Sequence, residues 1–259
     1  MKKRFFFFDV DNTLTIWPTG VIPEDTLYCL NKLKESGHEL AIATGRLQLD
    51  GDYFGRKAGI TNIIADGGES LTIDNQLLYM EGLDISMCRD YLAYLDEYDV
   101  RWAVTCTNER KRFTRFPDIQ QFIEDWDNYE TVVDSKLSLE NIEKFYKLFV
   151  YMTPEEEQNR GIAQMNKDII RYGNHCILYE PMTKSKGVKA MLERFNMPHE
   201  SAVVFGDGIN DLSLFDPAFL NIAMGNAKPE LKAKADYVTT DCDKGGILDA
   251  CRKFGFIEE

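Results

Sequence analysis

The sequence predicts an α/β protein in which a doubly wound parallel sheet is joined to a smaller, inserted α/β domain. Three observations support this fold class. Short apolar segments typical of buried strands alternate with amphipathic segments typical of helices. Two of the apolar segments end directly in pairs of acidic residues. Over residues 83–181 no apolar segment ends in this way, so we expect residues 1–82 and 182–259 to form a core domain and residues 83–181 to form the inserted one.

Size and composition set limits on what the chain can be. It has 259 residues, 44% of them hydrophobic, which is enough for two domains. A net charge of −13 and a pI near 4.8 disfavour nucleic-acid and anionic-membrane partners, because both would be repelled. No segment reaches transmembrane length, and Asp9 interrupts the first apolar run before it could serve as a signal peptide. We therefore expect a monomer or small homo-oligomer that binds a small molecule.

The six cysteines favour a reducing compartment. They lie far apart without a C-x-x-C pair, and the three histidines add no metal-finger spacing. Ordinary reduced thiols of a cytoplasmic protein are the expected interpretation.

The first strand is predicted over residues 5–8, four consecutive Phe followed by Asp9 and Asp11. Since side chains alternate along a strand, the two carboxylates should point the same way at the strand's carboxyl end, where open α/β sheets bind ligands. Like charges so close need a cation or a shared proton, and a divalent metal such as Mg²⁺ is the simplest remedy. The alternative is that these residues only turn the chain.

The other core elements are predicted from the Pro, Gly, Asn and Asp residues that begin or end helices and strands, and from the spacing of the apolar residues between them. We expect a helix between Pro23 and Gly37, strands over 39–43 and 63–65, a hairpin over 70–79 turning at Asp74-Asn75, a helix after Lys186-Gly187, strands over 202–205, 220–224 and 237–238, a helix over 229–235 and a last helix after Gly246.

Thr44-Gly45-Arg46 directly follows the second strand. A right-handed parallel crossover places Thr44 at the sheet edge that holds Asp9. The Thr44 hydroxyl, the backbone amides around Gly45 and the Arg46 guanidinium could then bind a phosphate. A plain turn at the end of a strand is equally compatible with this tripeptide.

The inserted domain is expected to mix helices and strands. Helical patterns cover residues 85–98, 119–128 and 154–170, and strand patterns cover 100–105, 147–153 and 175–179. Against its 12 Lys and Arg stand 19 Asp and Glu, so the basic run of Arg110, Lys111, Arg112 and Arg115 stands out. A solvated basic hairpin is the expected explanation, and contact with an anionic substrate is the alternative.

Two further polar groups follow the insertion. Lys186 opposes the helix macrodipole and Gly187 is a poor helix former, so a functional cation whose backbone approaches a ligand would explain the pair, with a solvated surface lysine as the alternative. The strand over 202–205 ends in Gly206-Asp207-Gly208-Ile209-Asn210-Asp211. This segment adds two carboxylates but matches neither the G-x-G-x-x-G nor the P-loop pattern.

Together these residues predict one acidic, cation-containing sheet edge without a catalytic Ser, His or Cys constellation. Such a site suits phosphoryl transfer with Mg²⁺ and an activated carboxylate.

In this arrangement the chain resembles the haloacid dehalogenase superfamily. Residues 8–15 resemble its D-x-D-x-T motif, residues 43–46 its second motif, Lys186-Gly187 its third and residues 206–211 its fourth. The insertion, Thr-Gly-Arg and Ala223-Met224-Gly225-Asn226-Ala227 are similar to its Cof-type phosphatases. Asn12 stands where the family usually has Gly, but Asn tolerates a left-handed backbone, so we expect the turn to survive.

The resemblance implies a Rossmann-like core, an inserted cap that closes over the site and chooses the substrate, and a role for each motif residue. Asp9 would be the nucleophile, and Asp11 would be the general acid and then the general base. Asp9, the Asp11 carbonyl and Asp207 would hold Mg²⁺, with Asp211 supporting them. The groups that bind the phosphoryl group would be Thr44, Gly45, Arg46, Lys186 and Asn210, and Lys186 would offset charge beside Asp9.

The expected activity is Mg²⁺-dependent hydrolysis of a small phosphomonoester, such as a sugar phosphate or a phosphorylated cofactor. A phosphomutase would use the same aspartyl-phosphate and return the phosphoryl group to a bound sugar. A sugar-phosphate sensor would keep the site without turnover, and a phosphoryl-accepting signalling domain is disfavoured by Asp11 and by the insertion.

Overall fold

The computed structural model describes residues 2–124, 127–160 and 169–257. The chain divides into two compact units, which we treat separately. The core unit comprises Met1–Met80 and Met182–Glu259, and the inserted unit comprises Glu81–Pro181.

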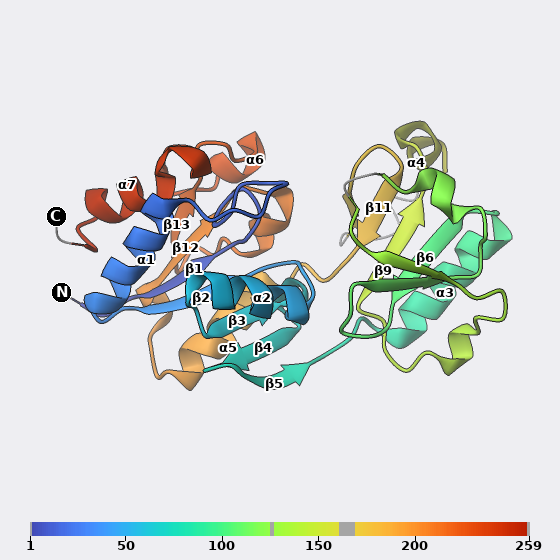
Figure 1. Cartoon of the computed structure of the whole chain (residues 1–259), viewed down its shortest axis with the longest axis horizontal. Helices are drawn as coiled ribbons and strands as arrows, with labels where there is room; N and C mark the ends of the chain where they lie inside the picture. The colour runs from blue at the N-terminus through green and yellow to red at the C-terminus, as the bar shows by residue number, and fades with distance from the viewer. Residues whose placement is uncertain (1, 125–126, 161–168, 258–259) are drawn as a thin grey trace. The chain divides into compact units, whose positions relative to one another are not determined.

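The described part of the core unit contains an eight-stranded sheet, drawn with its helices in Figure 1. The strand order is β14-β13-β12-β1-β2-β3-β4-β5. All neighbours from β14 to β3 are parallel, and the hairpin of β4 and β5 adds an antiparallel edge. The strands are β1 (Phe5–Phe8), β2 (Glu39–Ala43), β3 (Asn62–Ala65), β4 (Ser70–Ile73), β5 (Gln76–Met80), β12 (Ala202–Gly206), β13 (Leu220–Ala223) and β14 (Tyr237–Val238).

Strand β1 lies at the centre of this sheet with its four Phe side chains fully buried. Phe6 and Phe8 pack on one face in a cluster with residues of α1, α2 and α7, whereas Phe5 and Phe7 pack on the other face with α5. The helices are α1 (Glu24–Glu35), α2 (Gln48–Ala58), α5 (Lys184–Arg194), α6 (Pro229–Lys232) and α7 (Gly246–Lys253). A doubly wound α/β core is therefore confirmed.

The parallel register gathers the strand ends at one edge. Phe8 pairs with Ile42 of β2 and with Phe205 of β12, so the residues that follow these strands emerge side by side. The predicted hairpin is also confirmed, with Asp74 and Asn75 at positive φ in its turn. Helix α2 was not predicted from the sequence.

The described part of the inserted unit is built on a six-stranded sheet in the order β10-β11-β9-β6-β7-β8. Helix α3 packs on one face through Cys88, Leu92 and Leu95, and Ile119 packs on the other. The elements are α3 (Ile85–Glu97), β6 (Arg101–Thr105), β7 (Lys111–Thr114), β8 (Glu130–Val133), β9 (Lys147–Tyr151), α4 (Pro154–Arg160), β10 (Ile169–Arg171) and β11 (Cys176–Tyr179).

Two of the three predicted helices of this unit are wrong in part. In the segment 119–128 the described residues form a short 3₁₀ turn over Ile119–Phe122 and no α-helix, while residues 125 and 126 lie outside the described residues. In the segment 154–170, α4 ends at Arg160 and Ile169 begins a strand, while residues 161–168 lie outside the described residues. Strands β7 and β8 were not predicted because polar residues interrupt their apolar pattern, and β10 was not predicted because Ile169 and Ile170 fall in the helical pattern of residues 154–170.

The basic run of the inserted unit lies on the antiparallel hairpin of β6 and β7, as expected, but it is solvated only in part, since the Lys111 side chain is partly exposed and that of Arg112 is not. Arg112 is completely buried, donates to Asp127 and to the Thr131 hydroxyl, and lies over the ring of Phe149. Arg115 pairs with Asp96 at 3.5 Å and lies over the Trp102 ring. These two guanidinium groups stabilise the unit itself, so their contacts do not support the substrate-binding alternative for Arg112 and Arg115.

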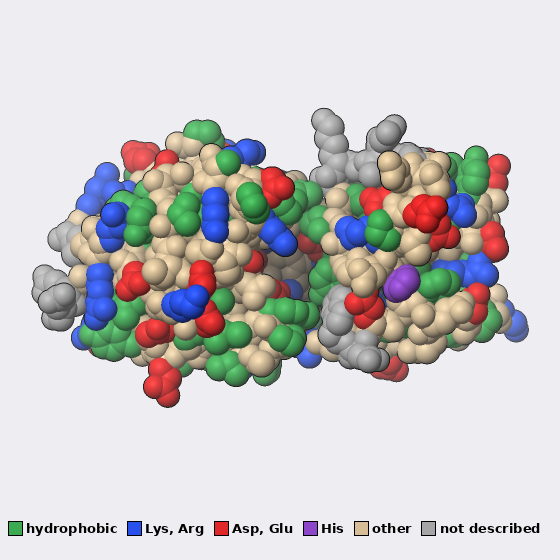
Figure 2. Space-filling model, turned by 90° about the horizontal axis from the view of Figure 1, so that it is seen from above, with side chains coloured by type: hydrophobic (Ala, Val, Ile, Leu, Met, Phe, Trp, Pro, Cys, Tyr) green, Lys and Arg blue, Asp and Glu red, His purple; other side chains and the backbone are tan. Residues whose placement is uncertain are grey.

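The distribution of charged side chains on the surface agrees with the acidic composition. On the face drawn in Figure 2, the described Lys and Arg side chains are scattered among Asp and Glu rather than gathered into one basic patch.

Among the described residues, no helix is long and apolar enough to cross a membrane. All six cysteines are free thiols.

Gly187 is needed for the packing of α5 rather than for close approach of a ligand. A Cβ atom at this position would lie 2.5 Å from Cγ2 of Ile64 in β3 and 3.5 Å from Cα of Gly68. The expectation that this glycine makes room for a ligand is therefore replaced by a packing explanation.

We predict that Gly187→Ala destabilises the protein by about 1–3 kcal/mol, the usual cost of overpacking a well-filled contact. Glu193→Ala on the exposed side of the same helix is the matched control and should change stability by less than about 0.5 kcal/mol. Chemical denaturation measures both. Equal stabilities of Gly187→Ala and the wild type would contradict the packing explanation.

Candidate active site

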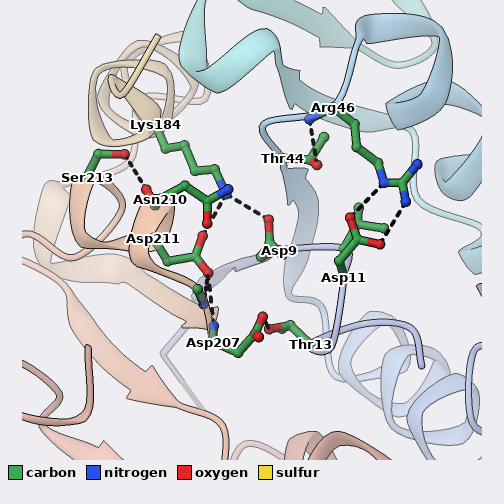
Figure 3. Close-up of polar contacts among 12 residues, drawn as sticks. Asp9, Asp11, Thr13, Thr44, Arg46, Lys184, Asp207, Asn210, Asp211 and Ser213 are labelled. Carbon is green, nitrogen blue, oxygen red and sulfur yellow. Dashed lines mark hydrogen bonds and ion pairs between the residues drawn. The ribbon is translucent and has the colours of Figure 1, made fainter. Parts of the chain in front are cut away.

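Four acidic side chains follow the ends of β1 and β12 (Figure 3). Asp9 directly follows β1 and is 5% exposed, and its backbone N–H donates to the Phe205 carbonyl of β12 at 3.0 Å. Asp207 follows β12 and accepts a hydrogen bond from the Thr13 hydroxyl at 3.1 Å. Asp211 is completely buried. The predicted meeting of the two acidic loops at one sheet edge is thus observed.

A buried lysine joins two of these carboxylates. The Lys184 ammonium donates to Asp9 Oδ1 at 2.7 Å and to Asp211 Oδ1 at 2.6 Å, and the residue is 1% exposed. Burial alone would lower the pKa of Lys184, but the carboxylates of Asp211 and Asp9 outweigh it and raise that pKa above its usual value. The site therefore holds a permanent ammonium ion.

The prediction that Lys186 lies beside Asp9 is wrong. Its side chain is 60% exposed and pairs with Glu69 at 3.0 Å. Periodicity contains the signal that we missed, because the buried residues of α5 are Lys184, Gly187, Val188, Met191 and Leu192. Position 184 lies one turn before Val188 on the buried face of the helix, whereas position 186 lies outside that face.

The pKa values of two carboxyls show how unfavourable the negative charge is here. Burial, followed by the charge of Asp211, raises the pKa of Asp9 to about 7, against the opposing effect of Lys184. Burial, followed by the charges of Asp9 and Asp211, raises the pKa of Asp207 to about 8. One ammonium ion is too little positive charge for three neighbouring carboxylates, so a further cation would be bound favourably.

The same three carboxylates fit a divalent metal. One oxygen each of Asp9, Asp207 and Asp211 lie within 4.8 Å of one another. Hard oxygen donors of this kind are what Mg²⁺ prefers. Asp211 Oδ2, however, accepts the backbone N–H groups of Asp207 and Gly208, each at 2.9 Å. Asp211 is thus placed to shape the loop and hold Lys184, which leaves the carboxylates of Asp9 and Asp207 as the less engaged oxygen donors of the three.

Asp11 points to a different partner from Asp9, contrary to the expected alternation (Figure 3). Its two oxygens accept Nε and Nη2 of Arg46 at 2.7 and 2.8 Å. The chain turns directly after β1, since the Leu14 N–H donates to the Asp9 carbonyl at 3.2 Å, and Asn12 within this turn has a φ of 54°. That left-handed turn is the one we expected of Asn12, and the Asn226 amide supports it by donating to the Asn12 carbonyl at 2.8 Å.

The remaining predicted residues lie on the same loops. Thr44 follows β2, is 1% exposed, and accepts the Arg46 backbone N–H on its hydroxyl at 3.1 Å. Gly45 lies between these two residues, and Asn210 directly precedes Asp211. The guanidinium of Arg46, which we had assigned to phosphate, is engaged by Asp11.

A haloacid dehalogenase-like hydrolase family model matches residues 6–251. The chain belongs to this family. Its fold is similar to that of a solved haloacid dehalogenase subclass IIB sugar phosphatase, with a TM-score of 0.78 at 24% identity over 98% of this chain and 100% of that one.

Curated relatives cover nearly the whole chain. A Bacillus subtilis protein named "Putative phosphatase YkrA" is 28% identical over 100% of both chains. A phosphoglycolate phosphatase of Nitrosopumilus maritimus is 24% identical over 98% of this chain and 96% of the relative. The resemblance to the haloacid dehalogenase superfamily, and with it the prediction of a hydrolase, is confirmed.

We predict that Lys184→Met lowers the stability of the protein by about 3–5 kcal/mol and abolishes turnover, because it leaves buried carboxylates without their cation. Lys186→Met is the matched control two residues away. Its side chain is largely exposed, so stability should change by less than about 0.5 kcal/mol. Thermal denaturation and an activity assay compare the two, and greater damage from Lys186→Met would refute the assignment.

Proposed function

We propose that the chain is a Mg²⁺-dependent phosphatase that hydrolyses a small phosphomonoester through an aspartyl-phosphate on Asp9. The observation that carries this proposal is the position of Asp9: a buried carboxylate at the end of the central strand, paired with Lys184 and adjacent to Asp207. Membership of a hydrolase family supports it.

Asp9 is the proposed nucleophile. One of its oxygens attacks phosphorus while the bond from phosphorus to the leaving-group oxygen breaks, and Asp11 gives that oxygen a proton. Asp11 then takes a proton from water as the water oxygen attacks phosphorus. The bond from phosphorus to Asp9 breaks, which releases inorganic phosphate and restores both carboxyl groups.

Mg²⁺ would be held by the carboxylates of Asp9 and Asp207 and by the backbone carbonyl of Asp11. When bound, it supplies the positive charge that the three carboxylates lack and that a phosphate dianion requires. Asp211 keeps Asp207 in place through the two backbone N–H groups that it accepts.

The groups proposed to bind the phosphoryl group are Thr44, the amide of Gly45, Asn210 and Lys184. Lys184 replaces Lys186 in this role, because Lys184 donates to Asp9 whereas Lys186 donates to Glu69. Its ammonium stabilises negative charge as phosphorus becomes five-coordinate.

The substrate is proposed to be a sugar phosphate or a phosphorylated cofactor, and we propose that the inserted unit selects it. The solved structure described as a sugar phosphatase supports a sugar phosphate, whereas the relative named for phosphoglycolate, a phosphorylated hydroxy acid, supports only the broader class of small phosphomonoesters. The direct test is release of inorganic phosphate, with Mg²⁺, from a panel of sugar phosphates, nucleotides and phosphorylated cofactors. Isomerisation without phosphate release would indicate a mutase, and binding without turnover a sensor.

We predict that Asp9→Asn abolishes turnover while the protein stays folded, because Asn is nearly isosteric but cannot attack phosphorus. Phosphate release and the far-UV circular dichroism spectrum are measured in parallel. The wild type should form an acid-stable phosphoprotein that this variant lacks. Activity of the variant at the wild-type level would exclude the covalent mechanism.

For Asp11→Asn we predict a loss that depends on the leaving group. Removal of a general acid typically costs about 10²–10⁴-fold. Alkyl phosphates should lose that much, and aryl phosphates less, because their leaving groups need little protonation. The measurement is kcat for both substrate types, and equal losses would assign Asp11 another role.

Metal binding should alter the dependence of stability on pH. Since the folded pKa values of Asp9 and Asp207 are raised to about 7 and about 8, the folded protein keeps protons that the unfolded chain releases near pH 4. The contribution of both groups to stability therefore falls as pH rises from about 4 to 8.

We predict that the wild type in EDTA loses thermal stability between pH 5.5 and 8, and that Mg²⁺ at a fixed concentration of 100 times the wild-type Kd restores about 2.7 kcal/mol at pH 8. In Asp207→Asn both effects should be smaller, because one of the two carboxyls is gone. Thermal denaturation is measured for both proteins, in EDTA and at the same Mg²⁺ concentration, at pH 5.5 and at pH 8. A Mg²⁺ effect of equal size in the variant would place the metal elsewhere.

A further inference from the structure

Arg46 holds both oxygens of Asp11. Its Nε donates to Oδ2 at 2.7 Å and its Nη2 donates to Oδ1 at 2.8 Å. A planar fork of donors fits a carboxylate in one orientation, so a bidentate pair fixes the rotation of the carboxylate as well as its position.

The guanidinium of Arg46 is itself fixed. It lies 5.7 Å from the ring centroid of Trp17 and 5.1 Å from that of Phe54. The backbone is anchored too, since the Arg46 carbonyl accepts the Asp66 N–H at 2.8 Å and its N–H donates to Thr44. An arginine held in this way is a rigid support rather than a mobile surface charge.

Asp11 needs such a support and Asp9 does not. The Asp9 side chain is 7% exposed and is held by Lys184, whereas the Asp11 side chain is 34% exposed on the loop after β1. A carboxylate with that exposure would otherwise occupy several rotamers, and ordering it during the reaction would cost entropy.

We propose that Arg46 is the positioning residue of Asp11: it fixes the carboxyl that exchanges protons with the leaving group and with water. This inference rests on the proposed function. The fork on both oxygens fits Asp11 as a carboxylate. When one Asp11 oxygen carries the proton that it gives to the leaving-group oxygen, as the bond from that oxygen to phosphorus breaks, the Arg46 donor on the other oxygen keeps the carboxyl in place. When the Asp11 carboxylate later takes a proton from water, the same support applies.

This role differs from phosphate binding, which the sequence suggested for Arg46. A phosphate ligand would act on every substrate and would appear in KM and in inhibition by inorganic phosphate. A positioning residue acts only through Asp11, so its loss should matter where Asp11 matters, namely in kcat for poor leaving groups.

The test uses the full-length enzyme with Mg²⁺ and compares Arg46→Gln and Arg46→Lys on an alkyl and an aryl phosphate. We expect Arg46→Gln to lower kcat for the alkyl substrate by about 10–100-fold, a part of the full general-acid contribution, and kcat for the aryl substrate by less than about 3-fold. Arg46→Lys keeps the positive charge but lacks the planar pair of donors. It should lower kcat for the alkyl substrate more than for the aryl substrate, with a smaller loss than Arg46→Gln causes. Arg56→Gln, an exposed arginine of α2 paired with Asp52, is the matched control and should behave as the wild type.

A double-mutant cycle with Asp11→Asn decides whether Arg46 acts through Asp11. If it does, Arg46→Gln adds no further loss in the Asp11→Asn background. Equal losses on both substrates, additive losses in the cycle, or an effect confined to KM and phosphate inhibition would each overturn the inference. Absence of phosphate release by the wild type on every substrate would instead overturn the proposed function, so the two failures are distinguishable.

Discussion

The contact between the buried Lys184 ammonium and two carboxylates is the interaction on which the core unit's site depends. Lys184, Asp9 and Asp211 are all nearly or completely buried, and each would be costly to bury alone. The lysine offsets one negative charge out of three, and the pKa values of Asp9 and Asp207 remain raised. The site is therefore stable enough to form and still short of positive charge. That shortage is the physical basis of the proposed binding of a cation and, with the cation, of a phosphate.

The position of this lysine depends on contacts between α5 and residues that are far from it in the sequence. Helix α5 begins at Lys184, and Gly187 lets it lie against Ile64 of β3. Just before it, Thr183 donates its N–H to the Gly67 carbonyl and its hydroxyl to Glu69. Lys186, which also pairs with Glu69, belongs to this attachment rather than to the chemistry. The segment after β3 thus sets where the ammonium lies relative to Asp9.

The parts of the molecule that sequence reasoning predicted are those governed by local rules. The four Phe of β1 had to be buried on both faces, and Asp74-Asn75 had to turn a hairpin. In the inserted unit the same rules predicted α3, β6, β9 and β11. They failed at Arg112, because its partners come from residues 127 and 131 and its burial is tertiary. The segment 119–128 carries helical periodicity, yet its apolar side chains pack as a short turn against β9 and β11. Local periodicity cannot distinguish these outcomes.

The error at Lys186 was of another kind, since the information was present. Because lysine usually lies at the surface, the sequence pattern alone indicates a buried apolar face of α5 only from Val188 onward. A buried lysine on that stripe becomes reasonable once two carboxylates are placed above it. Motif residues are better assigned from the face of the helix that they share with the core than from their order in the sequence.

The failed alternation of Asp9 and Asp11 follows from where β1 ends. The rule that residues two apart share a side holds only while the chain is extended. After Phe8 the backbone turns, with the Leu14 N–H donating to the Asp9 carbonyl and the Thr15 N–H to that of Val10. The turn gives the two carboxyls different surroundings: a buried ammonium and other acids for Asp9, and a partly exposed guanidinium for Asp11. Two identical side chains can take different chemical roles only when their environments differ, and this turn provides the difference.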